Sequence, residues 1–203
     1  AGVIVVALGK YTLVIMGCIC IQFFLVQPVF LLLRGLNPIS VFRKMSPAIA
    51  VALFTKSSAG TLPVTLASAE TNLKADPAVS RFVLPICTTI NMNGCAAFIL
   101  VTSLFVMQNA GYSLDMPTML TWLVVAVIAA IGNAGVPMGC YFLTLSLMSG
   151  IGAPIGLMGI ILPIYTIIDM IETAENVWSD SCVCAMTDHD LEGKLEPAAA
   201  VEA

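Results

Sequence analysis

The sequence has little charge. Only 10% of its 203 residues are charged, whereas 59% are hydrophobic, and the mean hydropathy is +1.01. An ordinary globular domain carries roughly 25% charged residues, so this composition indicates an integral membrane protein and makes the lipid bilayer its expected surrounding. Basic residues are scarcer than acidic ones, 8 against 12, and the net charge is −4. Proteins that bind nucleic acid present a basic surface, so no nucleic-acid partner is expected.

Histidine is almost missing, since the chain has only His189, in its polar C-terminal part. A membrane enzyme with Ser57 or Ser58 as nucleophile would need a base at membrane depth. The nucleophile motif G-x-S-x-G does not occur either. We therefore expect no enzyme, and keep a membrane enzyme only as a remote alternative.

The seven cysteines form no zinc motif in the sequence. Two C-x-C pairs exist, Cys18 with Cys20 and Cys182 with Cys184, but a structural zinc site usually takes four ligands. Most of the cysteines lie in apolar runs, where cysteine behaves as a small hydrophobe. No bound transition metal is expected from their spacing.

Long apolar runs are what the sequence does contain. Residues 11–33 carry no charged side chain and are long enough to cross about 30 Å of hydrocarbon. They lack the basic start and the Ala-x-Ala-like cleavage site of a signal peptide. Residues 82–109 and 151–186 predict two further spans, the first of them unwound at residues 91–94. Because the chain begins without Met one short step before a span, we expect it to be part of a longer protein.

Two segments predict hairpins rather than spans. Residues 40–73 contain a break rich in Ser, Gly and Pro at 55–63, and residues 118–148 contain a similar break at 132–139. The helical arms on either side are too short to cross a bilayer. Irregular backbone at membrane depth is tolerated only inside protein or along a water-filled cavity. The predicted fold is therefore all-α and membrane-integral, with two re-entrant hairpins and unwound helix segments.

The positions of the basic residues predict how the chain is oriented in the membrane. They lie in the first two loops, whereas the loop at 109–117 has none. The cytoplasmic loops of membrane proteins carry the excess of Lys and Arg, so the two hairpins should enter from opposite sides, the first from the cytoplasm. Residues 187–203 should form a disordered, acidic, cytoplasmic tail. The basic residues in question are Arg34, Arg43, Lys44, Lys74 and Arg81.

Polar residues recur on one face of the last span. At about 100° per residue, steps of 3, 4, 7 and 11 place them together. Ionisable groups at membrane depth usually face a polar cavity and mark a substrate or ion path. This face therefore indicates a transporter, although a leak conductance like that of an ion channel stays open. The residues are Asp169, Glu172, Thr173, Asn176 and Asp180.

Four motifs, in this order, resemble those of the dicarboxylate/amino acid:cation symporters, the glutamate transporter family. They are the tip at 55–63 (TKSSAGTLP), the unwound segment at 89–94 (TINMNG), the second tip at 130–137 (AIGNAGVP) and the ligand helix at 169–180. The resemblance covers about residues 10–186. It implies the C-terminal half of such a protein, with residues 1–186 as part of its transport domain. It also implies a homotrimer in the full-length protein and a plasma-membrane location, here the inner membrane of a bacterium.

The resemblance implies a substrate site. In it, Asp169 would bind the substrate ammonium and Asn176 its carboxylate, while Ser58 and the Val136 carbonyl would close over the ligand. Cys95 stands where the family usually has threonine, and Met138 replaces a glycine in the second tip. The implied substrate residues are Ser57, Ser58, Cys95, Val136, Cys140, Asp169, Glu172, Thr173 and Asn176.

The resemblance also implies sodium sites, with Na⁺ as a co-transported ion rather than a cofactor. The carboxylate of Asp180 would bind one ion together with the carbonyls of Cys87, Asn91 and Asn176. The alternative for Asp180 is a plain charge at a helix end. Asn93 replaces an acidic residue and keeps only a neutral oxygen, which puts a third ion in doubt. A second ion would take the carbonyls of Thr89, Ala130, Ile131 and Asn133.

Glu172 predicts the substrate class. It stands where members that carry acidic substrates have an arginine, and a carboxylate there would repel a dicarboxylate. The segment Glu172-Thr173-Ala174 is closer to the serine/threonine branch of the family. Lys56 either pairs with Glu172 or extends to the cytoplasmic interface. We expect sodium-coupled symport of a small neutral amino acid such as serine, threonine or alanine. The alternative is sodium- or proton-coupled symport of a dicarboxylate or an acidic amino acid.

Overall fold

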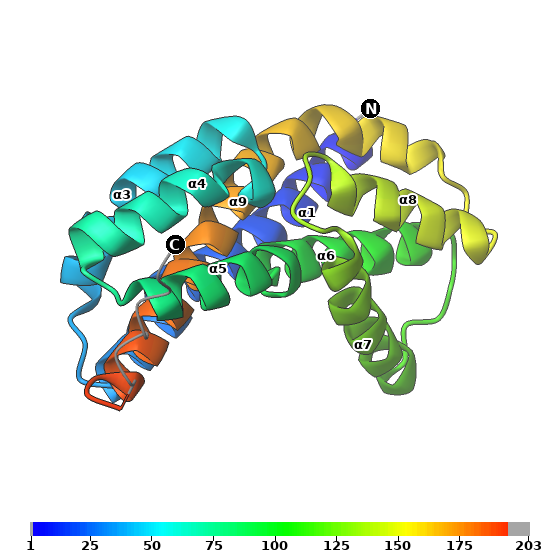
Figure 1. Cartoon of the computed structure of the whole chain (residues 1–203). Helices are drawn as coiled ribbons and strands as arrows, with labels where there is room; N and C mark the ends of the chain where they lie inside the picture. Colours follow the sequence, from blue (N-terminus) through cyan, green and yellow to red (C-terminus); the bar gives the residue numbers. More distant parts are fainter. Residues whose placement is uncertain (1, 195–203) are drawn as a thin grey trace.

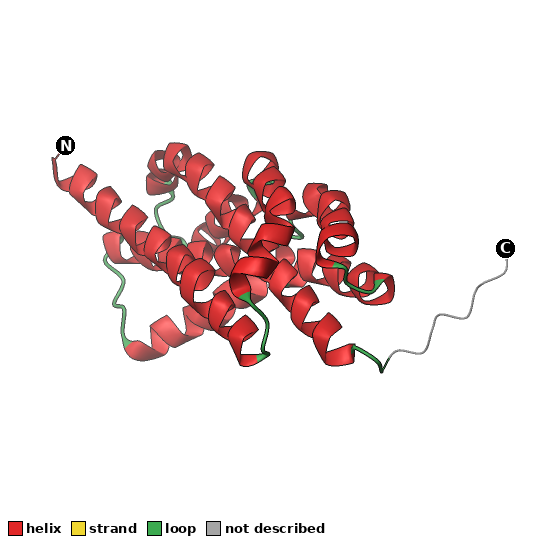
Figure 2. Cartoon of the chain, turned by 90° about the vertical axis from the view of Figure 1, so that its left-hand side faces the viewer, coloured by secondary structure: helices red, strands yellow, loops and turns green. Residues whose placement is uncertain are grey.

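The protein is built from helices joined by short loops (Figures 1 and 2). The computed structural model describes residues 2–194, and every regular element in that range is helical, which confirms the all-α class. In chain order these elements are α1 (Gly2–Ile21), η1 (Gln22–Val26), α2 (Gln27–Leu33), α3 (Pro38–Thr55), α4 (Ser58–Ser68), η2 (Ala69–Leu73), α5 (Pro77–Ile90), α6 (Asn93–Asn109), α7 (Met116–Gly132), α8 (Gly139–Gly150) and α9 (Gly156–Leu191).

Three helical stretches among the described residues are long and apolar enough to cross a membrane. They are Val6–Leu33, Pro77–Asn109 and Gly156–Leu191, and they coincide with the three predicted spans apart from their ends. The second stretch is interrupted at Asn91 and Met92, which have non-helical backbone angles. The predicted unwinding is therefore present, over two residues.

Three of the helices begin at an Asn or Asp followed closely by proline. Asn37, Asp76 and Asp115 each accept a hydrogen bond from a backbone N–H in the first turn, at 3.0, 2.7 and 3.0 Å. A side-chain oxygen at this position satisfies a donor that the helix cannot pair itself, and proline is tolerated in the first turn because it needs no partner there. These caps mark the starts of α3, α5 and α7.

The first hairpin consists of α3 and α4, which pack against each other. Its break is shorter than the predicted one at 55–63, because only Lys56 and Ser57 separate the two helices. The Ser57 hydroxyl accepts the Gly60 N–H at 3.0 Å and so starts α4 at once. Lys56, with a left-handed φ of 54°, ends α3.

The second hairpin, α7 and α8, has a longer tip at residues 133–138, close to the predicted one. Three residues of the tip have left-handed backbone: Ala134, Gly135 and Met138, with φ of 53°, 67° and 62°. Only glycine adopts this conformation without steric cost. Met138, which replaces the glycine of the family pattern, therefore holds a strained position at the start of α8.

The two hairpins come from opposite ends of the molecule and meet at their tips (Figure 1). The Ser57 hydroxyl donates to the Gly135 carbonyl at 2.9 Å, and the Ala59 N–H donates to the same oxygen at 3.2 Å. How the hairpins lie in a bilayer stays a prediction.

Helix α9 crosses the middle of the molecule and contacts α3, α5 and α6. It continues through Leu191, so the prediction of a disordered tail is wrong for residues 187–191. The reason is that this last part of α9 has partners. The Asp188 carboxylate accepts the Asp76 N–H at 2.8 Å, and Asp190 pairs with Arg34. Residues 195–203 of the predicted tail lie outside the described residues.

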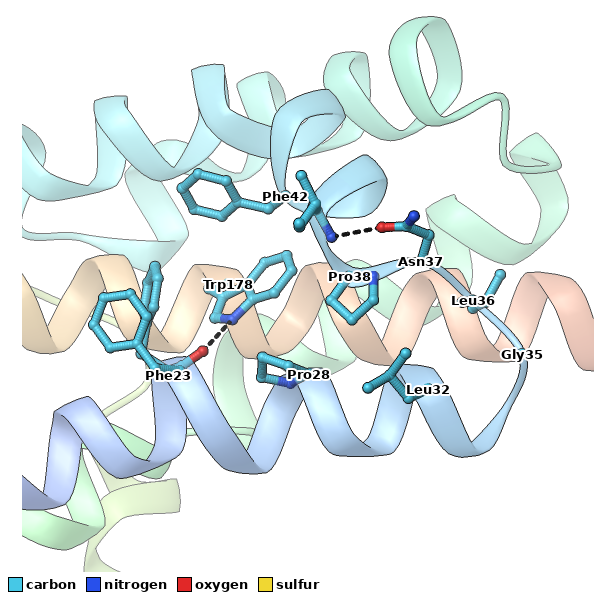
Figure 3. A pocket seen from close by; sticks show the side chains of 11 residues that line it. Phe23, Pro28, Leu32, Gly35, Leu36, Asn37, Pro38, Phe42 and Trp178 are labelled. Atoms are coloured by element: carbon cyan, nitrogen blue, oxygen red, sulfur yellow. Dashed lines mark hydrogen bonds between the residues drawn. The ribbon is translucent and has the colours of Figure 1, made fainter.

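A proline sets the contact between the first helix and α9. In η1 the backbone follows the wider i→i−5 pattern, with Gln27 donating to Gln22. Pro28 is next in line and has no N–H, so the Phe23 carbonyl lacks its backbone donor. The indole N–H of Trp178 donates to it instead, at 3.1 Å (Figure 3). An apolar groove of about 760 Å³ opens beside this contact.

Gly94 should be needed for the packing of α6 against α9. A Cβ atom at this position would lie 2.8 Å from Glu172 Cγ and 3.0 Å from its carbonyl oxygen. We expect Gly94→Ala to destabilise the protein by about 1–3 kcal/mol through overpacking. The matched control is Gly159→Ala, in α9, where a Cβ meets nothing within 4 Å. Thermal unfolding in detergent measures both, and equal midpoints would contradict the packing argument.

Candidate functional site

Four broken or buried segments converge on one small cavity. Its volume is about 10 Å³, which holds roughly one water molecule. The two hairpin tips, the break between α5 and α6, and the polar part of α9 all contribute to its wall. The lining residues are Lys56, Ser58, Met92, Cys95, Asn133, Gly135, Val136, Asp169, Glu172, Thr173 and Asn176.

Seven of the nine predicted substrate residues line this cavity. The two others are adjacent to it. Ser57 forms the tip-to-tip hydrogen bond with Gly135, and Cys140 donates to Glu172 at 2.9 Å. The site thus joins residues that lie far apart in the sequence, up to the 119 positions between Ser57 and Asn176. The structure brings the nine residues together, whereas the motifs do not indicate how tightly the cluster is closed. The role of these residues as substrate ligands stays a prediction.

Asp169 has one free oxygen. It is 3% exposed, and its Oδ1 accepts the Tyr165 hydroxyl at 3.1 Å. Its Oδ2 is buried without a hydrogen-bond partner. A buried polar atom without a partner is costly, and Asp169 lines the cavity, so this oxygen is available there as an acceptor. It is suited to an ammonium group.

Glu172 is held by two thiols. Its Oε1 accepts from Cys95 Sγ at 2.8 Å and from Cys140 Sγ at 2.9 Å, while its Oε2 has no partner. Lys56 lines the same cavity, but no ion pair joins it to Glu172 within the described part of the chain. Of the two sequence hypotheses for Lys56, the pair with Glu172 is therefore not formed here.

Asn176 caps a helix that is not its own. Its Oδ1 accepts the Gly94 N–H at 2.9 Å, in the first turn of α6. Met92, which precedes that helix, provides no side-chain cap. The buried start of α6 would otherwise leave this donor unsatisfied. The predicted carboxylate-binding residue thus fixes the unwound segment.

Asp180 is 1% exposed, and its Oδ1 accepts the Asn91 side-chain N–H at 2.9 Å. It is therefore no solvated charge at a helix end. Next to it, the side-chain nitrogens of Gln27, Asn91 and Asn93 lie 2.8, 2.9 and 2.6 Å from the Ser179 hydroxyl oxygen, which can accept from two of them at a time. The structure brings together Asp180 and Asn91 of the predicted first sodium set, and Asn93 joins them through Ser179.

The predicted second sodium set is more dispersed. Thr89 and Ile131 have exposed side chains, whereas Ala130 and Asn133 are buried. The carbonyls of Ala130 and Ile131 accept N–H groups of the tip, from Asn133 at 3.1 Å and from Ala134 at 3.5 Å. Helices α5 and α7, which carry the set, are in contact. Its role as an ion site stays a prediction.

Sequence reasoning missed several members of the site. Tyr165 lies one turn before Asp169, and this i, i+4 spacing could have identified it. Gly135 is the shared acceptor of the tip contact, which no motif indicates. Ser179 and Glu175 lie within the polar run of α9. Both oxygens of Glu175 are buried without a partner.

Broken helices that meet around buried carboxylates, inside a bundle with membrane-crossing helices, define an integral membrane protein of the transporter class. The family model described as the sodium:dicarboxylate symporter family matches residues 2–190. The chain belongs to this family, as the sequence motifs predict, and its members are transporters rather than enzymes.

Curated relatives agree with this assignment. Excitatory amino acid transporter 2 of Mus musculus is 34% identical over 190 residues, which is 93% of this chain and 33% of that protein. The human protein of the same name is 33% identical over the same shares. Excitatory amino acid transporter 1 of Ambystoma tigrinum is 32% identical over 93% of this chain and 35% of that protein. The chain spans about a third of the length of these relatives.

Ser57→Ala should loosen the closed tips. The change removes one of the two hydrogen bonds to the Gly135 carbonyl and the cap of α4. A hydrogen bond contributes a net of about 0.5–1.5 kcal/mol, so we expect the maleimide labelling rate of Cys95 and Cys140 to rise several-fold. Peptide mass spectrometry measures that rate. Ser46→Ala is the control, because the Ser46 hydroxyl bonds only to the Arg43 carbonyl. Equal labelling rates in both variants would show that the Ser57 hydroxyl does not hold the two tips together.

Proposed function

We propose that this protein takes part in the sodium-coupled symport of a small amino acid or dicarboxylate. One observation carries the proposal: two opposed hairpin tips close over a cavity that contains a buried, half-unpaired carboxylate, Asp169. Family membership supports the coupling to sodium. The chain spans about a third of the length of its relatives. The proposed activity is therefore that of the longer protein to which this segment would belong.

Access to the cavity requires movement of the tips. A volume of about 10 Å³ leaves no room for an amino acid, since it holds roughly one water. The contact between the tips consists of hydrogen bonds from Ser57 and Ala59 to one carbonyl, that of Gly135. Opening either hairpin breaks both bonds and exposes the cavity to its own side. Two hairpins that approach from opposite ends therefore support alternating access around a fixed site.

Substrate binding follows from the open acceptors and donors. We propose that Asp169 Oδ2 binds the ammonium group, because it is the carboxylate oxygen of that residue without a partner. The amide of Asn176 and the buried start of α4 at Ser58 would bind the carboxylate, where helix N-termini favour negative charge. The substrate would then connect α9 with the first hairpin.

Sodium binding is proposed at Asp180. This carboxylate is buried beside the unwound segment, where its Oδ1 accepts the Asn91 side-chain amide, and we propose that carbonyls of the break at Asn91 complete the ligand set. Oxygen ligands of this kind suit a hard cation, and unwound backbone supplies them in transporters. A bound Na⁺ would neutralise a charge that has only the Asn91 amide as its hydrogen-bonded partner.

The substrate is first proposed to be acidic. The family description names dicarboxylates, and the relatives are named excitatory amino acid transporters, which favours an acidic substrate over the neutral one expected from the sequence. Lys56 supports this proposal, because it lines the cavity and forms no ion pair with Glu172 within the described residues. It could bind the second carboxylate of such a substrate.

A neutral substrate is the second candidate, and Glu172 favours it. Its Oε2 has no partner and adds a second acidic side chain to the cavity beside Asp169. An acidic substrate would approach this carboxylate with a like charge. Serine, threonine or alanine would avoid that repulsion.

A competition panel decides between the two candidates. Uptake of labelled amino acids by proteoliposomes is measured against glutamate, aspartate, serine, threonine and alanine. For an acidic substrate, Lys56→Gln should raise its KM about tenfold or more, because a hydrogen bond to a charged group contributes about 1.5–3 kcal/mol. For a neutral one, Glu172→Arg should lower its uptake and admit acidic substrates, since guanidinium binds carboxylates bidentately. Uptake of neither class would refute both.

Asp180→Asn should weaken the coupling to sodium. The change removes the one carboxylate proposed for the ion and keeps the shape of the side chain. We expect the sodium concentration for half-maximal uptake to rise at least about tenfold, which corresponds to about 1.4 kcal/mol. Asp190→Asn, an exposed position of the same helix, should leave it unchanged. An unaltered sodium dependence in Asp180→Asn would exclude Asp180 as the ion ligand.

We further propose that the full-length protein is a homotrimer in the plasma membrane of a bacterium. Its C-terminal end would lie in the cytoplasm. The loops that carry Arg34, Arg43 and Lys74 support this orientation through their basic charge.

A further inference from the structure

Three ligand atoms from three different helices converge beside the cavity. Cys95 on α6, Cys140 on α8 and Glu172 on α9 are each at most 2% exposed. Both sulfur atoms lie within 2.9 Å of Glu172 Oε1, and all three ligand atoms lie within 4.8 Å of one another. The sequence motifs place all three near the substrate but do not indicate a ligand set, because 45 and 32 positions separate its members along the chain.

The cluster has unused ligand capacity. Glu172 lines the cavity, and its Oε2 is buried without a hydrogen-bond partner. The Asn133 side chain, which donates to Cys95 Sγ at 3.2 Å, likewise leaves its Oδ1 unpaired. A packing role for two small thiols would not require a buried carboxylate with a free oxygen, since such an atom is costly. The arrangement thus resembles a ligand set more than a core.

We propose that Cys95, Cys140 and Glu172 form a binding site for a thiophilic divalent cation such as Zn²⁺. Two thiolates and a carboxylate are typical zinc ligands, with Zn–S bonds of about 2.3 Å. Tetrahedral angles then separate the two sulfur atoms by roughly 3.8 Å, which the present spacing allows after small side-chain rotations. The fourth position points to the cavity, where a water molecule has room.

Binding exchanges protons for the cation. The two thiols of Cys95 and Cys140 lose their protons to solvent, and each resulting thiolate donates an electron pair to the metal. No oxidation takes place. Because protons compete with the metal for these ligands, the affinity should fall as the pH is lowered.

A bound cation would connect α6, α8 and α9. Since α8 is one arm of the second hairpin, the metal would hold that hairpin against α9 and occupy the side of the cavity at Glu172. This consequence rests on the proposed function, and it makes such cations inhibitors of uptake. The metal site itself is independent of transport.

Cadmium titration tests the site directly. The protein is purified in detergent and kept reduced with a phosphine, which excludes a disulfide between the two cysteines. Cd²⁺ is the probe, because cadmium thiolates absorb in the ultraviolet. We expect one Cd²⁺ per chain with this absorption, and displacement by Zn²⁺. Wild-type protein without thiolate absorption at saturating Cd²⁺ would overturn the proposal.

Matched variants locate the site. Cys140→Ser should weaken Cd²⁺ binding by at least about 100-fold. Loss of a residue that only orients a metal ligand costs about 10- to 100-fold, so a larger loss identifies Cys140 as a ligand itself. Cys182→Ser, also buried but outside the cluster, should bind like wild type. Glu172→Gln keeps both thiols and the side-chain shape, so it reports on the carboxylate even where Cys140→Ser folds poorly; its affinity should also fall. Unchanged affinity in both cluster variants would overturn the assignment.

Uptake distinguishes this inference from the proposed function. Zn²⁺ should inhibit uptake by wild-type protein, and Cys182→Ser, outside the cluster, should be inhibited to the same degree. Metal binding by a protein that transports no substrate would refute the proposed function and leave the site standing. Substrate uptake by a protein that shows no cadmium–thiolate absorption would refute the metal site and leave the proposed function standing.

Discussion

The polar run of α9 is the constraint on which the rest of the structure depends. Between Asp169 and Asp180, carboxylates, amides and hydroxyls are buried inside a chain that is 59% hydrophobic. Without water nearby, such groups need partners from the protein itself. Continuous helices offer few, because their backbone groups are already paired. The partners come from places where other helices are interrupted.

The break between α5 and α6 meets particular groups on α9. It offers the Gly94 N–H to Asn176 and the Asn91 amide to Asp180. The close approach of the two helices depends on the missing side chain of Gly94, which lies against Glu172. The broken helices and the polar helix are therefore one feature. A change that straightened the break would leave the α9 groups buried without partners.

The sequence predicts the elements well and the contacts less well. Apolar length identifies the three spans, because it is a local property, whereas the caps at Asn37 and Asp76 start α3 and α5 earlier than the predicted bounds of 40 and 82. The break at Lys56–Ser57 is shorter than predicted because one hydroxyl, that of Ser57, starts α4 immediately. The last turns of α9 are helical because Asp188 and Asp190 have distant partners. Composition alone cannot reveal such partners.

The membership of the candidate site is predicted from motifs, but its chemistry depends on side chains far apart in sequence. Asp169 and Asn176 lie near the cavity as the helical spacing requires. The absence of a Lys56–Glu172 pair and the two thiols on Glu172 could not be foreseen, since both depend on how α6 and α8 pack against α9. Glu172 argues for a neutral substrate by charge, whereas the relatives favour an acidic one. The charges in a sequence thus show which charged groups a site can offer, but not which substrate it binds.

The Gly135 carbonyl, which accepts from both Ser57 and Ala59, has a consequence for the resting ensemble. Two hydrogen bonds of about 0.5–1.5 kcal/mol each favour the joined tips by roughly 1–3 kcal/mol if they act alone. Closed molecules would then outnumber open ones by only about 5- to 150-fold. Thermal fluctuation would separate the tips in a measurable minority of molecules at any moment, and a ligand would need only a modest preference for either form to shift the balance.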